Sequence, residues 1–570
     1  MTAETAVRPA AHPAIEVDSR ARFEILGAIM LALFLGALDQ TIVGPVLPKI
    51  STQLNGVDFY TWVVTAYLVT STAAIPVYGK LSDYFGRKPM LLVGISLFLV
   101  GSVLSGLSQT MWQLILFRGV QGLGAGALFP ISLAVIGDLF TPAERGKYQG
   151  LFGAVFGVAF LVGPFLGGIL TDTLSWHWIF FVNVPVGLVS LYLIVKLLPM
   201  VRTPGVQFTL DIPGLITFIG AVVPVLIALT LAENGNWGDP YVLGGFAVGF
   251  VFLLAFLVAE AKAKDPMIPL DLFRNRTFAV SAVATFLAVF GFSTLIIFLP
   301  LWFQIVQGAS TTASGYLLFP FLFGLIVSSI AAGQIVSRTG HYKVLISGSM
   351  AVMAIGLALF INLRAETPTL VMWTWMLIAG LGVGPTMAIF TLIVQNDVSF
   401  EMLGTATSDL TLFRQIGTSV GLTMAFTLFR NNLTWGLIHD SIVGAGAPAA
   451  AVPVATPPQF DVGKLVSVGG SPIDAFAGIP NAFVGFYTTG FHEAFSIAIA
   501  NCVWLGVIAA VLAFLTTLAL KEKPLRSHFH TEQAARAGVR TIPSGRAAEG
   551  AELPAGPFGS LDSARERPGR

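Results

Sequence analysis

The chain has 570 residues, of which 55% are hydrophobic and 11% are charged, and its formal net charge is +1. Soluble domains carry roughly 25% charged residues, so this composition excludes an ordinary soluble protein and indicates a protein embedded in a membrane. The only cysteine, Cys502, excludes an intrachain disulfide framework and a thiolate metal site. The net charge by itself says nothing about acidic partners.

Apolar windows predict fourteen membrane-spanning helices, because about 20 apolar residues are needed to cross a bilayer. Residues 1–22 are polar and lack the apolar stretch of a signal peptide, so we expect a cytoplasmic tail. Residues 521–570 are rich in Pro, Gly, Arg and Glu and are expected to be a second, disordered tail. The predicted spans are 25–46, 60–79, 89–108, 111–131, 149–170, 178–198, 211–232, 241–260, 278–300, 313–336, 344–363, 370–393, 404–429 and 493–519.

The basic residues between the spans predict the orientation. Cytoplasmic loops carry an excess of Lys and Arg. With the N-terminus inside, the cytoplasmic side collects far more basic residues than the outer side. Both termini are then cytoplasmic, and we expect a multi-pass protein of the plasma membrane. The cytoplasmic residues are Lys80, Arg87, Lys88, Arg145, Lys147, Lys196, Arg202, Lys262, Lys264, Arg274, Arg276, Arg338 and Lys343, and the outer ones are Lys49, Arg364, Arg430 and Lys464.

Two charged residues lie inside the first and fourth spans, where charge is costly and usually functional. Asp39 and Arg118 each lie ~10 Å from the outer end of their span at ~1.5 Å per residue. These spans run in opposite directions, so the two side chains can face each other. A nearby arginine would hold the carboxylate charged, and proton arrival or a competing substrate would change the charge of the site. A static buried ion pair is the alternative.

The connection between the second and third spans is the polar segment Gly79-Lys-Leu-Ser-Asp-Tyr-Phe-Gly-Arg-Lys88. Its charged residues are Lys80, Asp83, Arg87 and Lys88. A short basic connection between two spans is expected on the cytoplasmic side. The apolar runs on both sides disfavour the alternative, which is a surface hairpin of a soluble protein.

Glycine and proline punctuate the fifth span, at Gly153, Gly157, Gly163-Pro164 and Gly167-Gly168. Small residues four apart let helices approach closely, and proline removes a backbone hydrogen bond, so this span is expected to pack tightly and to flex. Close packing alone accounts for the glycines, whereas the Gly163-Pro164 step is the more specific signal.

The thirteenth span carries a second acid and a second arginine. Asp409 lies about one turn from the cytoplasmic end, and Arg414 lies deeper. Asp409 is either a second protonation site or an interfacial acid, and both interpretations stay open. Asp39 and Asp409 lie at opposite depths, so a membrane-embedded enzyme that uses them as acid and base on one bond is implausible.

A repeat relates the two halves of the chain. Gly79 and Gly86 recur as Gly333 and Gly340, and Gly122-Leu-Gly-Ala-Gly126 recurs as Gly380-Leu-Gly-Val-Gly384, at nearly the same offset. Paired six-helix halves are a common architecture of transporters. The expected fold is an all-α integral membrane protein with fourteen transmembrane helices. Its expected domains are a six-helix bundle at 23–200, two inserted linker helices at 201–265, and a second six-helix bundle at 266–520.

The second bundle includes an outer loop of about 60 residues at 431–492, rich in Pro, Gly and Ala. It is too long for a simple connection, so it is either a partly ordered cap or a flexible insertion. We expect it to be dispensable for the fold.

Residues that could line a central cavity are one amide and several aromatic side chains. Aromatic rings can stack on a lipophilic substrate or solvate a cationic one. With 45 Phe in the chain, most aromatic residues must face lipid or packing neighbours. The candidates by depth are Gln121, Trp62, Tyr67, Phe156, Phe160, Phe298 and Trp302.

The segment Gly79-x-Leu-x-Asp83-x-x-Gly86-Arg87-Lys88 resembles the loop between helices 2 and 3 of the major facilitator superfamily. The helix 5 glycines with Pro164, the segment Leu38-Asp-Gln-Thr-Ile-Val43 and the segment Trp176-His-Trp-Ile-Phe-Phe-Val-Asn-Val-Pro185 resemble the fourteen-helix drug:proton antiporters of that superfamily. The branch usually has Asn at the position of Gly44 and Ala at that of Val46, which bears on substrate class rather than on fold.

The resemblance implies a major facilitator fold that exports lipophilic or cationic drugs in exchange for protons by alternating access. It implies proton coupling at Asp39 and Arg118, and gating at the Gly79–Lys88 loop. Asp409 and Arg414 are further candidates for coupling. The same fold exporting a lipid or a secreted metabolite is the alternative.

Other function classes lack support in the sequence. Gly122-x-Gly-x-x-Ala127 fits a dinucleotide-binding pattern but lies inside a membrane span with no preceding strand, and no phosphate-binding loop for ATP is present. The scattered histidines do not form a metal-binding pattern, and no basic-aromatic platform for nucleic acid is present. We therefore expect a monomeric transporter, not an enzyme, without cofactor or metal, whose partners are small molecules, protons and the lipid bilayer.

Overall fold

The computed structural model describes residues 18–56, 59–200, 211–233, 236–399, 402–449, 452–454 and 482–525, and every regular element in these ranges is a helix. The first helices are α1 (Ser19–Ile42), η1 (Gly44–Val46), α2 (Leu47–Gln53), α3 (Tyr60–Phe85), α4 (Arg87–Gly106), α5 (Met111–Leu139), α6 (Pro142–Thr173), α7 (Trp178–Phe181) and α8 (Asn183–Leu197). Then come α9 (Ile212–Ala232) and α10 (Pro240–Lys262). The rest are α11 (Asp271–Arg274), α12 (Arg276–Ile305), α13 (Thr311–Leu317), α14 (Phe319–Thr339), α15 (Lys343–Leu359), η3 (Phe360–Asn362), α16 (Thr369–Asp397), α17 (Leu403–Asn432), α18 (Trp435–Gly444) and α20 (Val484–Leu518).

Thirteen helical segments in the described ranges are long and apolar enough to cross a membrane, judged by length and composition. They correspond to thirteen of the predicted spans. The remaining predicted span, 404–429, is α17, a continuous helix of 30 residues. It is less apolar because its first half carries Asp409, Arg414 and many hydroxyl side chains, and most of that half is buried against other helices rather than facing lipid. The protein is an all-α, multi-pass membrane protein.

Local sequence signals set the helix ends. Thr141 and Glu144 form a capping box at the start of α6, where Pro142 occupies the first turn. At the α3–α4 connection a single residue, Gly86, separates the two helices, and its φ of +94° is one that other residues rarely adopt. We call the end of the helix bundle that holds this connection the basic end, and the other end the opposite end.

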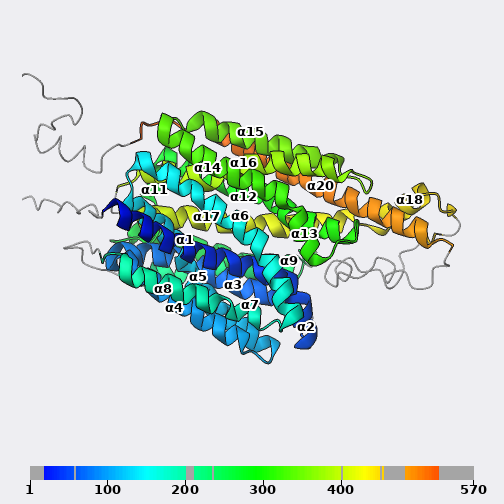
Figure 1. The fold of residues 1–570 in the computed structure, drawn as a ribbon, viewed down its shortest axis with the longest axis horizontal. Coiled ribbons are helices and arrows are strands. Elements are labelled where there is room, and N and C mark those ends of the chain that lie inside the picture. The colour runs from blue at the N-terminus through cyan, green and yellow to red at the C-terminus, as the bar shows by residue number, and fades with distance from the viewer. Residues whose placement is uncertain are drawn as a thin grey trace, which may run out of the picture. The chain divides into compact units, whose positions relative to one another are not determined.

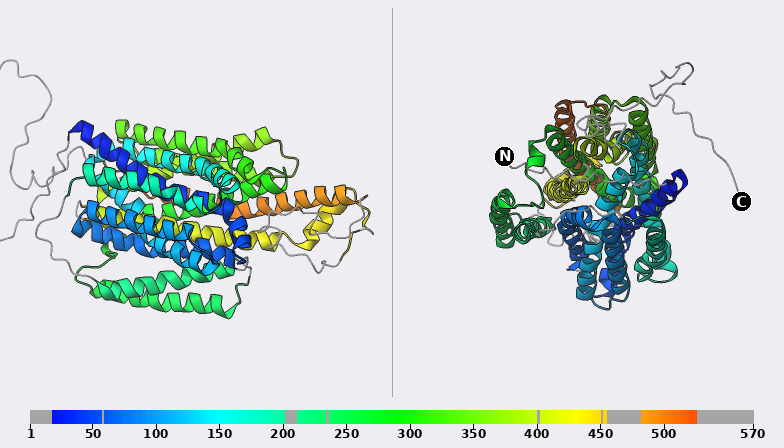
Figure 2. Two further views of the ribbon diagram at one scale, coloured as in Figure 1. Left: turned by 60° about the horizontal axis from the view of Figure 1, so that its bottom comes forward. Right: turned by 90° about the vertical axis from the view of Figure 1, so that its left-hand side faces the viewer.

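The helices form two sets, which pack side by side in Figures 1 and 2. The first set is α1–α8, in which α5 packs between α3 and α4. The second set is α12–α20, in which α16 packs between α14 and α15. Contacts between the sets are made by α3 with α17 and by α6 with α14 and α16. The pair α9–α10 lies at the side of the bundle, where α9 contacts α3 and α17 (Figure 2).

The repeated glycine segments pack in the same way in both sets. A Cβ on Gly124 of α5 would lie 2.2 Å from the backbone nitrogen of Phe98 in α4. A Cβ on Gly382 of α16 would lie 2.3 Å from the backbone nitrogen of Met353 in α15. In both sets, the glycine lets the central helix touch its neighbour backbone to backbone. The repeat seen in the sequence is therefore also a repeat of packing.

The predicted outer loop 431–492 is partly helical. It contains α18, whose buried face includes Trp435 and Ile438, and its last nine residues belong to α20, which begins at Val484 rather than near 493. Both helices extend past the other helices at the opposite end (Figure 1). The described portion is thus an ordered cap, and residues 455–481 lie outside the described residues, as do 1–17 and 526–570 of the predicted tails. Deleting 431–492 would remove α18 and the first turns of α20 as well as the connection, and the dispensability of the segment for the fold stays a prediction.

Candidate functional site

Asp39 lies at the centre of a buried polar cluster formed by α1, α4, α5 and α8. Its Oδ2 accepts a hydrogen bond from Nη1 of Arg118 at 2.7 Å, within an ion pair. Its Oδ1 accepts from Nε2 of Gln121 at 2.8 Å and from Nδ2 of Asn183 at 3.0 Å. The exposed fraction of the Asp39 side chain is 0%. The structure therefore joins the two residues that equal depth suggested, and both carboxylate oxygens of Asp39 accept hydrogen bonds.

Arg118 is held in place by more than its ion pair. Its Nη1 also donates to Oε1 of Gln121 at 2.9 Å, and its guanidinium carbon lies 4.2 Å from the centre of the Tyr67 ring. Its Nε has no hydrogen-bond partner, although it is buried. The arginine is thus fixed by an acid, an amide and an aromatic face, and loss of the acid's charge would leave it largely uncompensated.

Asn183 is a site residue that the sequence did not single out. It is the first residue of α8, and its Nδ2 donates both to Asp39 and to Ser102 of α4, at 3.1 Å from the hydroxyl oxygen. Its exposed fraction is 0%. An amide inside an apolar segment was the available signal, but its partner lies 144 positions earlier, so only the folded chain could identify it.

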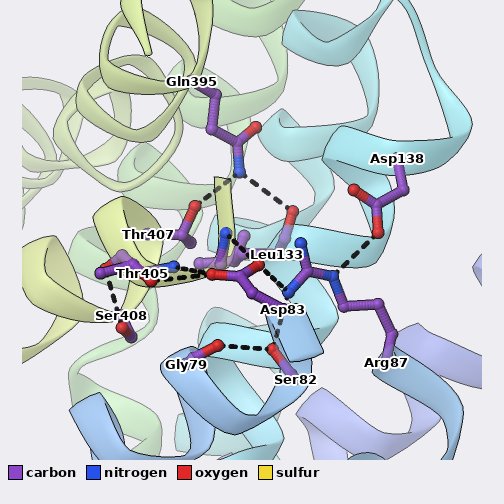
Figure 3. A network of polar contacts seen from close by, with 11 residues as sticks. Gly79, Ser82, Asp83, Arg87, Leu133, Asp138, Gln395, Thr405, Thr407 and Ser408 are labelled. Carbon is purple, nitrogen blue, oxygen red and sulfur yellow. Dashed lines mark hydrogen bonds and ion pairs between the residues drawn. The ribbon is translucent and has the colours of Figure 1, made fainter. Parts of the chain in front are cut away.

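At the basic end, Asp83 of α3 binds the start of α17 (Figure 3). Its Oδ1 accepts from the backbone nitrogen of Gly404 at 3.1 Å, and its Oδ2 accepts from the backbone nitrogen and the hydroxyl of Thr405, each at 2.8 Å. The first backbone N–H groups of a helix have no partners within the helix, and its N-terminus favours negative charge. Asp83 therefore caps a helix of the other set.

The predicted gating residue Arg87 links this cap to the first set. It forms an ion pair with Asp83 at 2.5 Å, and its Nε donates to Oδ2 of Asp138 at 2.9 Å. Gln395 of α16 adds a second bridge, because its Nε2 donates to Leu133 of α5 at 3.1 Å and to Thr407 of α17 at 3.0 Å (Figure 3). Of the other loop residues, Lys88 donates to the carbonyl of Val195 in α8 at 2.7 Å. The basic end is closed by polar contacts in this structure.

The glycines of α6 contact two different helices. A Cβ on Gly153 would meet Ser329 of α14 at 2.4 Å, and one on Gly157 would meet Ile326 of the same helix, also at 2.4 Å. Nearer the opposite end, a Cβ on Gly163 would lie 2.1 Å from the hydroxyl oxygen of Thr41 in α1. Thus α6 packs against both the second set and α1, and Pro164 follows the glycine that contacts α1.

Asp409 and Arg414 of α17 do not pair with each other. Both carboxylate oxygens of Asp409 are buried without a hydrogen-bond partner, and so are Nε and Nη2 of Arg414. The exposed fraction of Asp409 is 0%, and the charged groups that act on it are Glu260, Asp83 and Lys80. The structure thus leaves open whether Asp409 is a protonation site.

The predicted cavity residues occupy different environments. Phe156 and Phe160 of α6 are half-buried, and Trp62 is half-buried among apolar residues near the opposite end. Tyr67 is buried against Arg118. Phe298 packs edge-on against Phe426 and at a tilt against Phe429, and Trp302 donates to Ser496; Phe298 and Trp302 are both fully buried within the second set. Phe156, Phe160 and Trp62 combine partial exposure with a place on a helix that contacts the other set, α6 for the two phenylalanines and α3 for the tryptophan.

The described residues contain no group of three or more His, Cys, Asp or Glu side chains that could hold a metal ion. The polar chemistry of the site is instead one of paired and unpaired charges inside the helix bundle. Asp39 has three donors, whereas Asp409 and the Nε and Nη2 of Arg414 have no hydrogen-bond partner among the described residues.

Known proteins are similar to this chain in sequence and in fold. The family model described as Major Facilitator Superfamily matches residues 29–422. The chain is 37% identical over 529 residues to "Multidrug transporter protein MdtP" of Bacillus subtilis (strain 168), covering 90% of this chain and 96% of that protein. It is 35% identical to "Multidrug resistance protein 3" of the same organism, with 87% and 94% covered.

Two solved structures are similar in fold. The human organic anion transporter MFSD10 (TETRAN) is 14% identical with a TM-score of 0.57, covering 86% of this chain and 99% of that one. The proton:xylose symporter XylE is 15% identical with a TM-score of 0.53, covering 89% and 98%. At these identities the likeness concerns the fold alone.

Proposed function

The chain belongs to the major facilitator superfamily and is a membrane transporter rather than an enzyme, and we propose that it exports lipophilic small molecules, drugs among them, in exchange for protons. The observation that carries the proposal is the buried Asp39 cluster, because it is an acid whose charge is balanced by an adjacent arginine. Two relatives at 35–37% identity bear names of multidrug transport or resistance and support the choice of substrate class.

Protonation of Asp39 would change the cluster in a defined way. The carboxylate accepts from Arg118, Gln121 and Asn183, whereas a protonated carboxyl group carries no charge and must donate its own hydrogen. The net charge of the Asp39–Arg118 pair would change from zero to +1. Because an uncompensated buried charge is strongly unfavourable, protonation would favour rearrangement of the four helices that hold the cluster.

The basic end supplies the gate of the proposed mechanism. Export by alternating access requires the two sets to separate at each end in turn. At the basic end that separation would break the bonds from Asp83 to Gly404 and Thr405. We propose that the basic end faces the cytoplasm of a cell whose plasma membrane holds the protein, and that the two helix sets are its moving halves.

The test is proton release on substrate binding by purified protein in detergent. Wild-type protein should release protons when it binds a transported dye, and Asp39→Asn protein should release at least about tenfold fewer while still binding neutral substrates. Asp172→Asn is the matched control, because it removes a carboxylate whose side chain is 77% exposed. Equal proton release from wild type and Asp39→Asn would move the coupling role elsewhere, with Asp409 as the next candidate.

A second measurement tests the cargo. Reconstituted protein is given a fluorescent dye or a fluorescent lipid, with and without an imposed pH gradient. Transport of the dye that depends on the gradient supports the proposal, whereas transport of the lipid alone would favour lipid export on the same fold.

A further inference from the structure

Arg414 lies inside α17, and its guanidinium has no acceptor among the residues that the structure describes. Its Nε and Nη2 are buried and have no hydrogen-bond partner, in contrast to Arg118, whose Nη1 is bound to both a carboxylate and an amide. A guanidinium stays charged at any physiological pH. Unpaired charge inside a membrane protein is costly and is kept where it serves a function.

One aromatic ring of the first set lies over this guanidinium, and two further rings pack against that ring. Its central carbon lies 5.6 Å from the centre of the Phe152 ring of α6. Phe152 packs edge-on against Phe129 of α5 and at 4.9 Å from Phe156, and Phe129 stacks on Phe156 at 5.1 Å. Arg414 comes from the second set and the rings come from the first, so the cluster lies between the two sets.

The cluster lies about a third of the way along its helices from the basic end. Arg414 follows the start of α17 by 11 residues, Phe152 follows the start of α6 by 10, and Phe129 precedes the end of α5 by 10. Each is therefore about 15 Å from the basic end at ~1.5 Å per residue. Arg414 and Phe156 are half-buried rather than sealed. Transporter substrate sites lie at the interface of the two repeats.

Neither Asp39 nor Asp409 is placed to neutralise Arg414. Asp39 is already bound by three donors in another cluster. Asp409 precedes Arg414 by five residues, which places it about 140° around the helix at about 100° per residue, and no ion pair joins the two. A ring face attracts the guanidinium but cannot accept the directed hydrogen bonds that its N–H groups offer.

We propose that Arg414, with Phe129, Phe152 and Phe156, forms a subsite for the carboxylate of a lipophilic, aromatic substrate. A carboxylate accepts two parallel hydrogen bonds from a guanidinium, and the rings would pack on the apolar body of the same molecule. The inference rests on the proposed export function and narrows its substrate class, because a fixed positive charge disfavours the cationic compounds that the family resemblance implies.

The test compares three ligands that share one apolar body: 1-pyrenebutyric acid, its primary amide, and 1-pyrenebutylamine. Binding to wild-type protein in nanodiscs is measured by fluorescence anisotropy at pH 7.5 and corrected for empty nanodiscs. The acid should bind at least about tenfold more tightly than the amide, and the amine most weakly, because hydrogen bonds between charged groups carry such differences. Equal affinity for acid and amide, or preference for the amine, would overturn the proposal without any variant.

Three variants test whether Arg414 causes the preference for the acid over the amide. Arg414→Gln should abolish the preference for the acid over the amide, and Arg414→Lys should keep part of it, because lysine retains the charge but not the planar fork. Arg430→Gln is the matched control: it removes an arginine from the same helix, 16 residues or about 24 Å away, and should leave the preference intact. Retention of the full preference in Arg414→Gln, or its loss in Arg430→Gln, would show that Arg414 does not bind the carboxylate.

Transport of the same three ligands separates this inference from the function on which it rests. A wild-type protein that binds the acid selectively but exports none of the ligands from proteoliposomes would contradict the proposed function and keep the subsite. Export of the amine in preference to the acid would keep the function and overturn the subsite.

Discussion

Two interfaces join the helix sets at the basic end, and they are built on one plan. In the first, a Cβ on Gly79 of α3 would lie 2.0 Å from the hydroxyl oxygen of Ser408 in α17, with the Gly404 carbonyl oxygen at 3.1 Å. In the second, a Cβ on Gly333 of α14 would lie 2.1 Å from the carbonyl oxygen of Gly146 in α6. Gly333 is the counterpart of Gly79 in the repeat, so the same crossing occurs twice.

The polar chemistry differs between the two interfaces. Asp83 and Arg87 of the first loop correspond in the repeat to Ser337 and His341 of the second. Asp83 bonds across to α17, whereas the second interface is a contact of glycine backbones, in which Gly150 of α6 also faces Ser329. The carboxylate at the first crossing can be solvated when the contact opens, whereas the crossing of α6 and α14 rests on close backbone packing.

At the connection between α14 and α15, the basic partner of the ion pair comes from the segment after α20. In the first set Arg87 pairs with Asp138 at the end of α5, and in the second Lys523, past the end of α20, pairs with Asp397 at the end of α16. Glu522 accepts from the backbone nitrogen of Tyr342 at 2.9 Å, at the start of α15. The segment from Lys521 to Leu525 thus ties the second set to itself and makes no comparable bond to the first.

Removing the charge at the first interface should have the largest effect. Asp83→Ala removes the acceptor of three hydrogen bonds, and each bond to a charged group is worth about 1.5–3 kcal/mol. The closed-to-open ratio of the basic end should fall at least about tenfold, and transport should be impaired while membrane insertion is unchanged. Uptake by inside-out vesicles, normalised to the inserted amount, measures it. Ser337→Ala is the matched control and should stay close to wild type; normal transport by Asp83→Ala would refute the gate.

The next largest effect is expected from adding a side chain at the glycine of each crossing, and its size should distinguish the two crossings. Gly333→Ala places a Cβ against the backbone of Gly146, which cannot rotate away, and should cost about 1–3 kcal/mol. Gly79→Ala meets chiefly the Ser408 side chain, so Ser408→Gly should restore part of the lost stability. Thermal unfolding in detergent measures both. If Ser408→Gly gives no rescue, the first crossing is as rigid as the second and the contrast fails.

Loss of the lysine ion pair should have a small effect on stability and little on transport. The Lys523 side chain is 48% exposed, so Lys523→Ala should cost up to about 1 kcal/mol and should show less effect at high salt. Lys521→Ala, at an exposed neighbouring position, is the control. A loss of transport as large as that of Asp83→Ala would mean that the second loop is also a gate.

The smallest effect concerns α9, which flanks the first interface. Burial raises the pKa of Glu233, at the end of α9, to about 7. Because the folded protein favours the protonated acid, this contribution to stability is present below the ordinary pKa near 4.5 and is lost as the pH rises through about 7. The melting temperature of wild type should fall over that range more than that of Glu233→Gln. Parallel curves for the two proteins would show that Glu233 is solvated.

Much of the fold could be predicted because the bilayer restricts the chain to long apolar helices. The depth of each residue along its span was sufficient to predict that Asp39 and Arg118 lie close together. The two spans are antiparallel, and both residues lie at the same distance from the outer end. The same reasoning places Asp409 and Arg414 on α17. It could not predict that they lack partners, because that depends on which neighbouring side chains face them.

Contacts between distant segments could not be predicted from the sequence. Asp83 had an evident charge, yet its partners are backbone N–H groups more than 300 residues later, which carry no residue-type signal. Residues 521–525 had the composition of a disordered tail, and only the folded second set offers the free helix start and the carboxylate that order them.

The cap that Asp83 places on α17 has a consequence for hydration. When the basic end opens, the backbone N–H groups of Gly404 and Thr405 lose their acceptor, and N–H groups at a helix start must be satisfied by another partner or by water. Opening therefore requires water to enter between α3 and α17 as the bonds break. Opening of the gate therefore hydrates the contact between α3 and α17, and closing dehydrates it. Solutes that lower water activity should slow opening more than closing.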